Sequence, residues 1–156
     1  MKTKVMSVVC VLALLLTLTA CGGSDSQPQK SAAEIADAIY STQTFQDTLN
    51  AIDADMLGDY YRIDAADLTD SKVYVSGSFS TAEEIAVFQA SSSDAVENIK
   101  KAIDTRLEDL KLAFENYVPG EMTKINDPVL ITKGTTVVLV LADDTAAVSD
   151  QVNELL

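Results

Sequence analysis

Two adjacent carboxylates, Glu83 and Glu84, are the residues whose type and spacing first suggest chemistry. Glycoside hydrolases use two carboxyl groups that flank one bond at a separation of roughly 5 Å or more. The segment EEIAVFQA that begins at Glu83 is typical of a buried strand, in which neighbouring side chains point to opposite faces. We therefore favour a structural role over catalysis. Of the two residues, we expect Glu84 to be the one that is buried in an ion pair with Arg106 or a lysine.

The segment DADMLGDYYRID carries acidic residues at the spacing of a calcium-binding loop. Asp53, Asp55 and Asp59 fall on positions 1, 3 and 7 of such a loop, and a glycine falls on position 6. Position 5 is Leu57, which has no side-chain oxygen, and position 12 is Asp64 instead of a longer, bidentate glutamate. An acidic turn before a strand is therefore the favoured interpretation, and calcium binding is the weaker alternative.

The composition excludes several kinds of catalytic site. The chain has no histidine, and its two cysteines, Cys10 and Cys21, both lie near the N-terminus. Histidine general bases, Ser-His-Asp triads and the usual zinc sites are thereby excluded within this chain. Acidic residues outnumber basic ones by 24 to 11, which gives a formal net charge of −13. We expect no nucleic-acid partner for such a surface, and we expect no cofactor.

The N-terminal residues 1–20 have the parts of an export signal: a basic start with Lys2 and Lys4, an apolar run, and Ala20 before Cys21. The sequence LTAC at the end of this run resembles the lipobox of bacterial lipoproteins, whose cysteine thiol carries lipid and becomes the first residue after cleavage. Two or more acyl chains hold a protein stably at a bilayer. We expect Cys21 to be a lipid attachment site at the outer face of the cell membrane. An ordinary signal peptide is the alternative.

The rest of the chain divides into a linker and a domain. Residues 21–30 are rich in Gly, Ser and Gln, and we expect the lipidated cysteine to be followed by a flexible tether. Residues 31–156 have a length that suits one domain with one core. Because two of the lysines lie in the predicted signal, its removal would lower the formal charge from −13 to −15.

The clearest predicted element is a helix over about residues 94–117, in which apolar residues recur at steps of three and four along one face. Asp94 and Glu97 have the spacing of a capping box at its start. A second capping box, Ser31 with Glu34, predicts the first helix, and an aspartate after the last strand predicts a third.

Four segments are typical of strands, and they form two hairpins. The alternation in SKVYVS predicts a strand that pairs with EEIAVFQA, and VLIT pairs with TTVVLVLA through a turn at Lys133 and Gly134. The stretch over residues 45–57 is less regular and weakly favours short helices. The predicted fold class is α+β, with an antiparallel sheet of about four strands and the long amphipathic helix on one face.

The motifs LGDYYRID, TAEEIAVF, FENYVPGE and GTTVVLVLADD, together with Arg106 and the lipobox, resemble a family of small bacterial lipoproteins that is catalogued as a domain of unknown function. The resemblance covers roughly residues 32–144. The chain departs from the family after the turn glycine, where Thr135 and Thr136 stand instead of a more typical Tyr-Val pair. The resemblance implies a membrane-tethered, extracytoplasmic domain and assigns no catalytic residue.

The residues that we single out for a structural or functional role are Glu83, Glu84, Arg106, Tyr117 and Pro119. We expect a non-enzymatic binding or accessory domain that is held at the membrane through lipid on Cys21 and that binds a protein or a cell-wall component. The alternatives are a carboxylate-dependent hydrolase acting on cell-wall or glycan material, and a calcium-dependent binding module.

Overall fold

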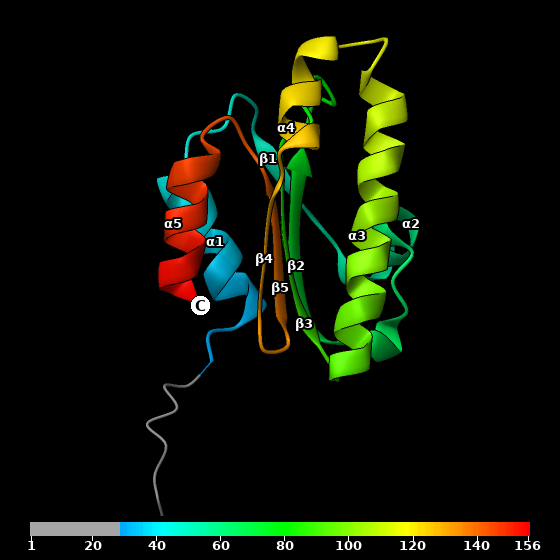
Figure 1. Cartoon of the computed structure of the whole chain (residues 1–156), viewed down its shortest axis with the longest axis vertical. Helices are drawn as coiled ribbons and strands as arrows, with labels where there is room; N and C mark the ends of the chain where they lie inside the picture. The colour runs from blue at the N-terminus through cyan, green and yellow to red at the C-terminus, as the bar shows by residue number, and fades with distance from the viewer. Residues whose placement is uncertain (1–28) are drawn as a thin grey trace, which may run out of the picture.

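A computed structural model of the chain describes residues 29–156. The predicted signal, the proposed lipid site at Cys21 and most of the predicted tether lie outside the described residues. Figure 1 shows a central sheet with helices on both of its faces. Within the described part of the chain, no helix combines the length and the apolar character needed to cross a bilayer.

The sheet is antiparallel and has five strands in the order β1-β2-β3-β5-β4. Two of the three inner strands, β3 and β5, are apolar along almost their whole length because helices cover both of their faces. The strands are β1 (Leu49–Ile52), β2 (Leu68–Ser76), β3 (Glu84–Ala90), β4 (Val129–Lys133) and β5 (Thr136–Leu141).

The antiparallel sheet and both predicted hairpins are confirmed, but the expected count of four strands is one too low. The additional strand is β1, which lies in the stretch where the sequence weakly favours short helices. It has only four residues, LNAI, of which two are exposed, so it carries no usable alternation. Its conformation is fixed by pairing with the distant strand β2.

The turn between β4 and β5 is shifted by one residue from the prediction. Lys133 pairs with Thr136, so the two turn residues are Gly134 and Thr135. Gly134 has a φ of +60°, which glycine adopts without steric cost.

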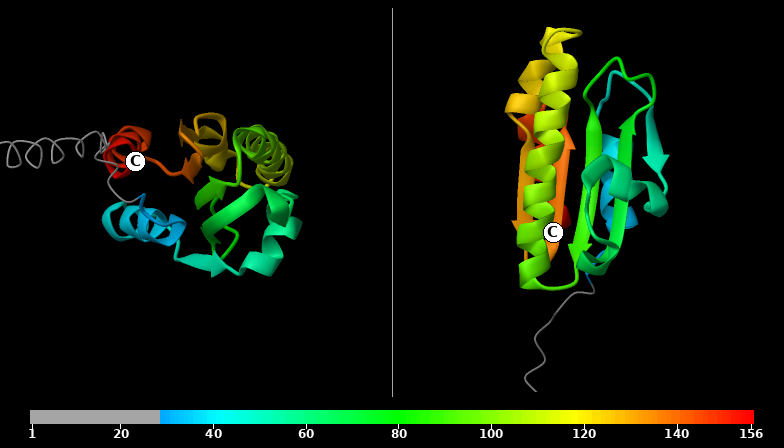
Figure 2. Two further views of the ribbon diagram at one scale, coloured as in Figure 1. Left: turned by 90° about the horizontal axis from the view of Figure 1, so that it is seen from below. Right: turned by 90° about the vertical axis from the view of Figure 1, so that its right-hand side faces the viewer.

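The helices form two outer layers. On one face lies the long helix α3 (Ser93–Phe114), accompanied by the short helices α2 (Leu57–Tyr61) and α4 (Met122–Asn126). On the other face lie α1 (Ala32–Thr42) and α5 (Thr145–Leu155). Figure 2 shows the two layers from below and from the side. The predicted packing of the long helix on one face is confirmed, and the second helical layer completes a three-layer arrangement.

The helix caps agree with the sequence at α1 and differ at α3. Ser31 and Glu34 form the expected capping box at the start of α1. At α3 the cap is Ser92, whose hydroxyl accepts the backbone N–H of Ala95. Asp94, the predicted cap, lies inside the first turn, where a negative charge is favourable beside the positive end of the helix dipole.

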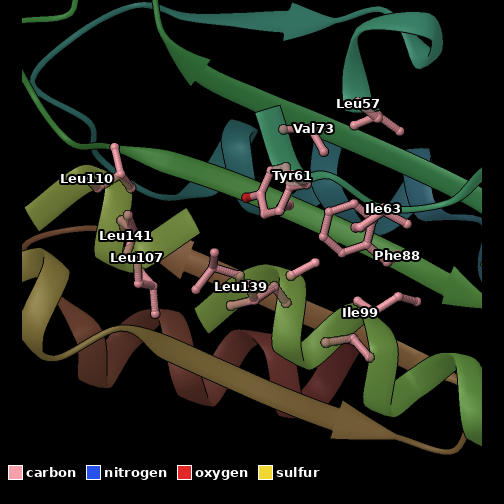
Figure 3. Close-up of a cluster of buried hydrophobic side chains, with 14 of the residues drawn as sticks. Leu57, Tyr61, Ile63, Val73, Phe88, Ile99, Leu107, Leu110, Leu139 and Leu141 are labelled. Atoms are coloured by element: carbon pink, nitrogen blue, oxygen red, sulfur yellow. The ribbon is translucent and has the colours of Figure 1, made fainter. Parts of the chain in front are cut away.

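Each face of the sheet carries its own hydrophobic core. Figure 3 shows the core beneath α3, in which the ring of Tyr61 meets the ring of Phe88 edge to face with centroids 5.0 Å apart. Ile99 and Leu107 of α3 fill the space above β5. The second core lies under α1 and α5 and contains mainly Ile and Val side chains.

The fold has two distinct ends. The chain enters at the end that holds the β4–β5 turn and the start of α3, while α4 and the end of α3 lie at the opposite end (Figure 1). We call the second of these the α4 end. It contains residues 81–84 at the start of β3, so most of the candidate residues from the sequence gather there.

Candidate functional site

Glu84 is the first residue of β3, and its side chain points toward α3 on the same face of the sheet as Phe88. The guanidinium of Arg106, on α3, contacts both carboxylate oxygens of Glu84, with Nη2 2.6 Å from Oε2 and Nε 3.4 Å from Oε1. The ion pair that the sequence predicts between these residues is therefore present. Both side chains are largely removed from solvent.

Tyr61 is a third member of this group. Its hydroxyl donates a hydrogen bond to Oε1 of Glu84, and its ring is buried in the core. Burial and the adjacent Glu84 carboxylate raise the pKa of Tyr61 well above the ordinary value for tyrosine. The ring of Tyr60 lies 5.3 Å from the guanidinium carbon of Arg106, within the range of a cation–π contact.

The surroundings of Arg106 favour its charged form. Burial lowers the pKa of Arg106, but the attraction of the Glu84 carboxylate outweighs that effect, and the net shift is upward. A charged pair with a tyrosine donor satisfies the hydrogen bonds of Glu84 inside the apolar layer between β3 and α3. We call these three residues, Glu84, Arg106 and Tyr61, the Glu84 group.

Glu83 has different partners, as expected for adjacent residues at the start of a strand. Its two carboxylate oxygens accept the backbone N–H groups of Gln46 and Asp47, each at 2.9 Å. The hydroxyl of Thr81 adds a third hydrogen bond at 3.2 Å. Glu83 thus fixes the segment between α1 and β1 to the start of β3.

Lys124 of α4 is only 3% exposed, and it places one positive charge among three carboxylates. Its ammonium nitrogen lies 2.9 Å from Glu121, 3.3 Å from Asp143 and 3.7 Å from Glu83. Burial lowers the pKa of Lys124, but the hydrogen bond and charge of Glu121, together with the charges of Glu83 and Asp143, raise it overall. We call these four residues the Lys124 group.

The Lys124 group connects four separate segments. Glu121 accepts the backbone N–H of Ala82 at 2.8 Å, which ties α4 to the start of β3. Asp143, after β5, accepts the side-chain amide of Gln46 at 2.7 Å. That hydrogen bond, and then the charge of Lys124, lower the pKa of Asp143 against a smaller opposing effect of burial.

Asp47 closes the neighbouring loop between β2 and β3. Its Oδ2 accepts the hydroxyls of Ser76 and Ser78 at 2.5 Å and the backbone N–H of Ser78 at 2.9 Å. The hydroxyls of Ser76 and Ser78 hold the pKa of Asp47 well below its usual range. Glu83, Glu121, Asp143 and Asp47 are thus connected through Lys124 and the segment of Gln46 and Asp47, and each of these carboxylates accepts hydrogen bonds.

The space beside the Glu84 group is small. A cavity of about 30 Å³ is lined by Glu84, Arg106 and Phe79 among others, which is room for about one water molecule. A sugar ring does not fit in this volume. Because Glu83 and Glu84 also point to different partners, the arrangement serves to fasten segments together and does not present two carboxyl groups to one substrate.

Two of the five residues singled out from the sequence lie apart from these groups. Tyr117 follows the end of α3 and is 76% exposed. Pro119 begins the 3-10 turn Pro119–Glu121 that leads into α4. Neither residue lines the cavity beside Glu84.

The acidic segment proposed as a weak calcium site is largely helical. Asp55 lies in the 3-10 turn Ala54–Met56, with Asp53 just before it, and Asp59 lies in α2. Within residues 29–156, no group of three or more acidic, histidine or cysteine side chains is arranged to hold a metal ion. Asp55 does line a different cavity, of about 480 Å³, between α2 and β2.

Sequence reasoning missed Lys124, Glu121 and Asp47, and it did not connect Tyr61 with Glu84. No periodic pattern marks these residues, since they come from short turns and loops. The one local signal is the spacing of Glu121 and Lys124, three residues apart, which suits an ion pair within one helical turn.

The comparison with protein families gives one match. A model described as "Domain of unknown function (DUF4358)" matches residues 42–142. The chain belongs to the DUF4358 family. The matched region of this DUF4358 protein contains all five strands, the Glu84 group and three of the four residues of the Lys124 group, with Asp143 just beyond it. No curated protein and no solved structure matches the chain.

Proposed function

We propose that this DUF4358 protein is a lipid-anchored binding domain without enzymatic activity, located at the outer face of the cell membrane. The absence of enzymatic activity in this proposal is supported by the contacts of the carboxylates at the α4 end, which are already bound by other groups of the protein. Glu84 is held by Arg106 and Tyr61, and Glu83 is held by two backbone N–H groups beside Lys124. Such carboxylates stabilise a fold and are not free to transfer protons to a substrate.

The sequence LTAC before a polar linker supports the anchoring part of the proposal. Cys21 lies ten residues before Ser31, the cap of the first helix, so a lipidated chain has a short connection between the bilayer and the fold. The chain enters at the end opposite α4 (Figure 1). Under this proposal the α4 end is directed away from the membrane.

Mass spectrometry of the native protein tests the anchoring. We expect a chain that begins at Cys21 and carries the mass of acyl groups on that residue. The variant Cys21→Ser should lack the lipid, whereas Cys10→Ser is a matched control that should keep it, because Cys10 lies in the segment that is removed. An unmodified Cys21, or a chain cleaved elsewhere, would overturn the anchoring.

Incubation of the full chain with cell-wall fragments tests the absence of catalysis. We expect no release of soluble product above a buffer control. Product release by the wild type that is lost in Glu84→Gln would replace the proposal with a hydrolase that depends on the Glu84 carboxylate.

A further inference from the structure

The strand β2 pairs with β3 over most of its length, with a register shift between Leu68 and Asp70, but it is only partly paired on its other side. It spans nine residues, but β1 pairs with only four of them, from Val73 to Ser76. Among the described residues, no strand lies beside Leu68–Lys72 on the side away from β3. A half-strand of this kind offers backbone N–H and C=O groups to another chain, although here the N–H of Ser71 already donates to Oδ1 of Asp70 at 2.9 Å, a bond that an added strand would have to displace. We call Leu68–Lys72 the open edge.

The cavity of about 480 Å³ lies against the open edge. It is lined by four successive residues of β2, from Leu68 to Ser71. Successive side chains of a strand point to opposite faces, so a cavity that touches all four lies beside the edge and reaches the backbone of the strand. Its volume is within the range of sites that bind ligands.

The opposite wall of the cavity comes from α2 and the segments around it. Leu57 and Ile63 contribute apolar surface, and Gly58 faces open space, because a Cβ added there would meet no atom within 4 Å. The cavity can therefore receive an apolar side chain from a chain lying along the edge.

The charge at the cavity selects the kind of partner. Its charged lining residues are Asp55 and Asp70, and no basic residue lines it, although Lys72 lies at the end of the open edge. The carboxylate of Asp70 accepts the backbone N–H groups of Ala32 and Ser71, so Asp55 is the acidic residue left to meet a partner. A second copy of this chain would bring the same carboxylates to the edge, and two molecules of formal charge −13 repel each other. A basic chain is attracted.

We propose that the open edge binds an extended, basic peptide segment of a partner protein as an added strand, with one apolar side chain of that peptide in the cavity. Strand addition obtains affinity from backbone hydrogen bonds and specificity from pockets for alternate side chains. The inference rests on the proposed binding function and adds to it the surface and the chemistry of the partner.

The test uses capped eight-residue peptides that alternate lysine with valine, leucine, isoleucine or phenylalanine. Fluorescence anisotropy with the full chain should show saturable binding for at least one of them. Replacing lysine with glutamate removes the charge attraction, and methylating alternate backbone nitrogens removes backbone hydrogen bonds. Each change should weaken that binding by about tenfold or more. Hydrogen exchange should slow at residues 68–72 when the peptide is bound.

Two pairs of variants locate the contact. Gly58→Leu places a side chain in part of the cavity and should weaken binding by about tenfold or more. Gly120→Leu is the control, because Gly120 also lies in a helical turn with open space around it, and it should have no effect. Asp55→Lys should weaken binding several-fold, and Asp104→Lys, an exposed α3 residue outside the cavity, should change it less.

Absence of saturable binding by every peptide would overturn the inference. Binding that survives both backbone methylation and Gly58→Leu would also overturn it, because charge alone would then explain the association. Concentration-dependent dimers that Gly58→Leu abolishes would assign the open edge to a second copy instead. All of these results are independent of Cys21, so they are distinguishable from a failure of the proposed anchoring.

Discussion

The guanidinium of Arg106 lies 2.6 Å from the carboxylate of Glu84, and this pair joins α3 to the first residue of β3 inside an apolar layer. Buried ion pairs contribute little to the free energy of unfolding when compared with an apolar pair of similar size. Removal of one partner is nevertheless strongly destabilising, because the other charge stays buried without a counter-charge. The contact therefore adds a polar link between α3 and the sheet, through two side chains 22 residues apart, to the apolar packing of the helix.

We predict that Arg106→Met lowers the free energy of unfolding by about 3–5 kcal/mol, because it leaves Glu84 without a cation. The double variant Glu84→Gln with Arg106→Met should lose clearly less, since glutamine has no charge and can still accept from Tyr61. Denaturant unfolding of the three proteins measures both values. Equal losses in the single and double variants would contradict this account.

We predict a similar loss, about 3–5 kcal/mol, for Lys124→Met, because Glu83 and Glu121 are buried around its ammonium group. The matched control is Lys100→Met, which removes an exposed i,i+3 pair with Glu97 and should cost less than about 1 kcal/mol. Denaturant unfolding gives both numbers. If the two variants lose the same amount, the Lys124 group does not fasten the α4 end.

We predict that stability falls at high pH partly through Tyr74. Burial and the hydrogen bond to Asp37 raise the pKa of Tyr74 to about 12. Because the folded pKa is above the unfolded value of about 10, this contribution is fully present below pH 10 and is lost as the pH rises through 12. Tyr74→Phe should therefore show a shallower decline between those values in unfolding measurements. An unchanged slope would assign the alkaline loss to other groups, such as Tyr61 and Lys124.

We predict that Phe79→Asn stabilises the fold by about 0.5–1 kcal/mol. Phe79 has a φ of +57° and is 68% exposed, and this backbone region is unfavourable for a bulky residue but tolerated by asparagine. Phe79→Ala, which keeps a Cβ and gains no local hydrogen bond, should give little or no gain. Thermal unfolding of the wild type and the two variants measures the order of their stabilities. A destabilised asparagine variant would show that packing of the Phe79 ring outweighs its backbone strain.

The predictable parts of the fold are those with a strong local pattern. The apolar stripe of α3, the capping box at Ser31 and the β-branched run of β5 each determine their element through neighbours in sequence. The separation of Glu83 from Glu84 follows in the same way from the alternation of a strand.

The remaining parts depend on contacts between distant segments. Strand β1 exists because β2 pairs with it, and four residues carry too little pattern to reveal that. Lys124 meets Glu83 and Asp143 only after α4 is placed over the start of β3. Neither the spacing along the chain nor the residue types predict these contacts. The Lys124 group and the open edge could therefore be identified only from the structure.

The cavity of about 610 Å³ at the other end of the molecule is lined by Gln29 and Lys30 and also by Leu155 and Leu156, and the ammonium group of Lys30 donates to the backbone carbonyl of Leu155 at 2.8 Å. The start and the finish of the described fold are thus neighbours. A fluorescent label joined to Leu156 would, under the proposed anchoring, report on distance to the bilayer, whereas a label on the exposed Tyr117 would report from the far side. The pair would act as a molecular ruler for the orientation of the domain.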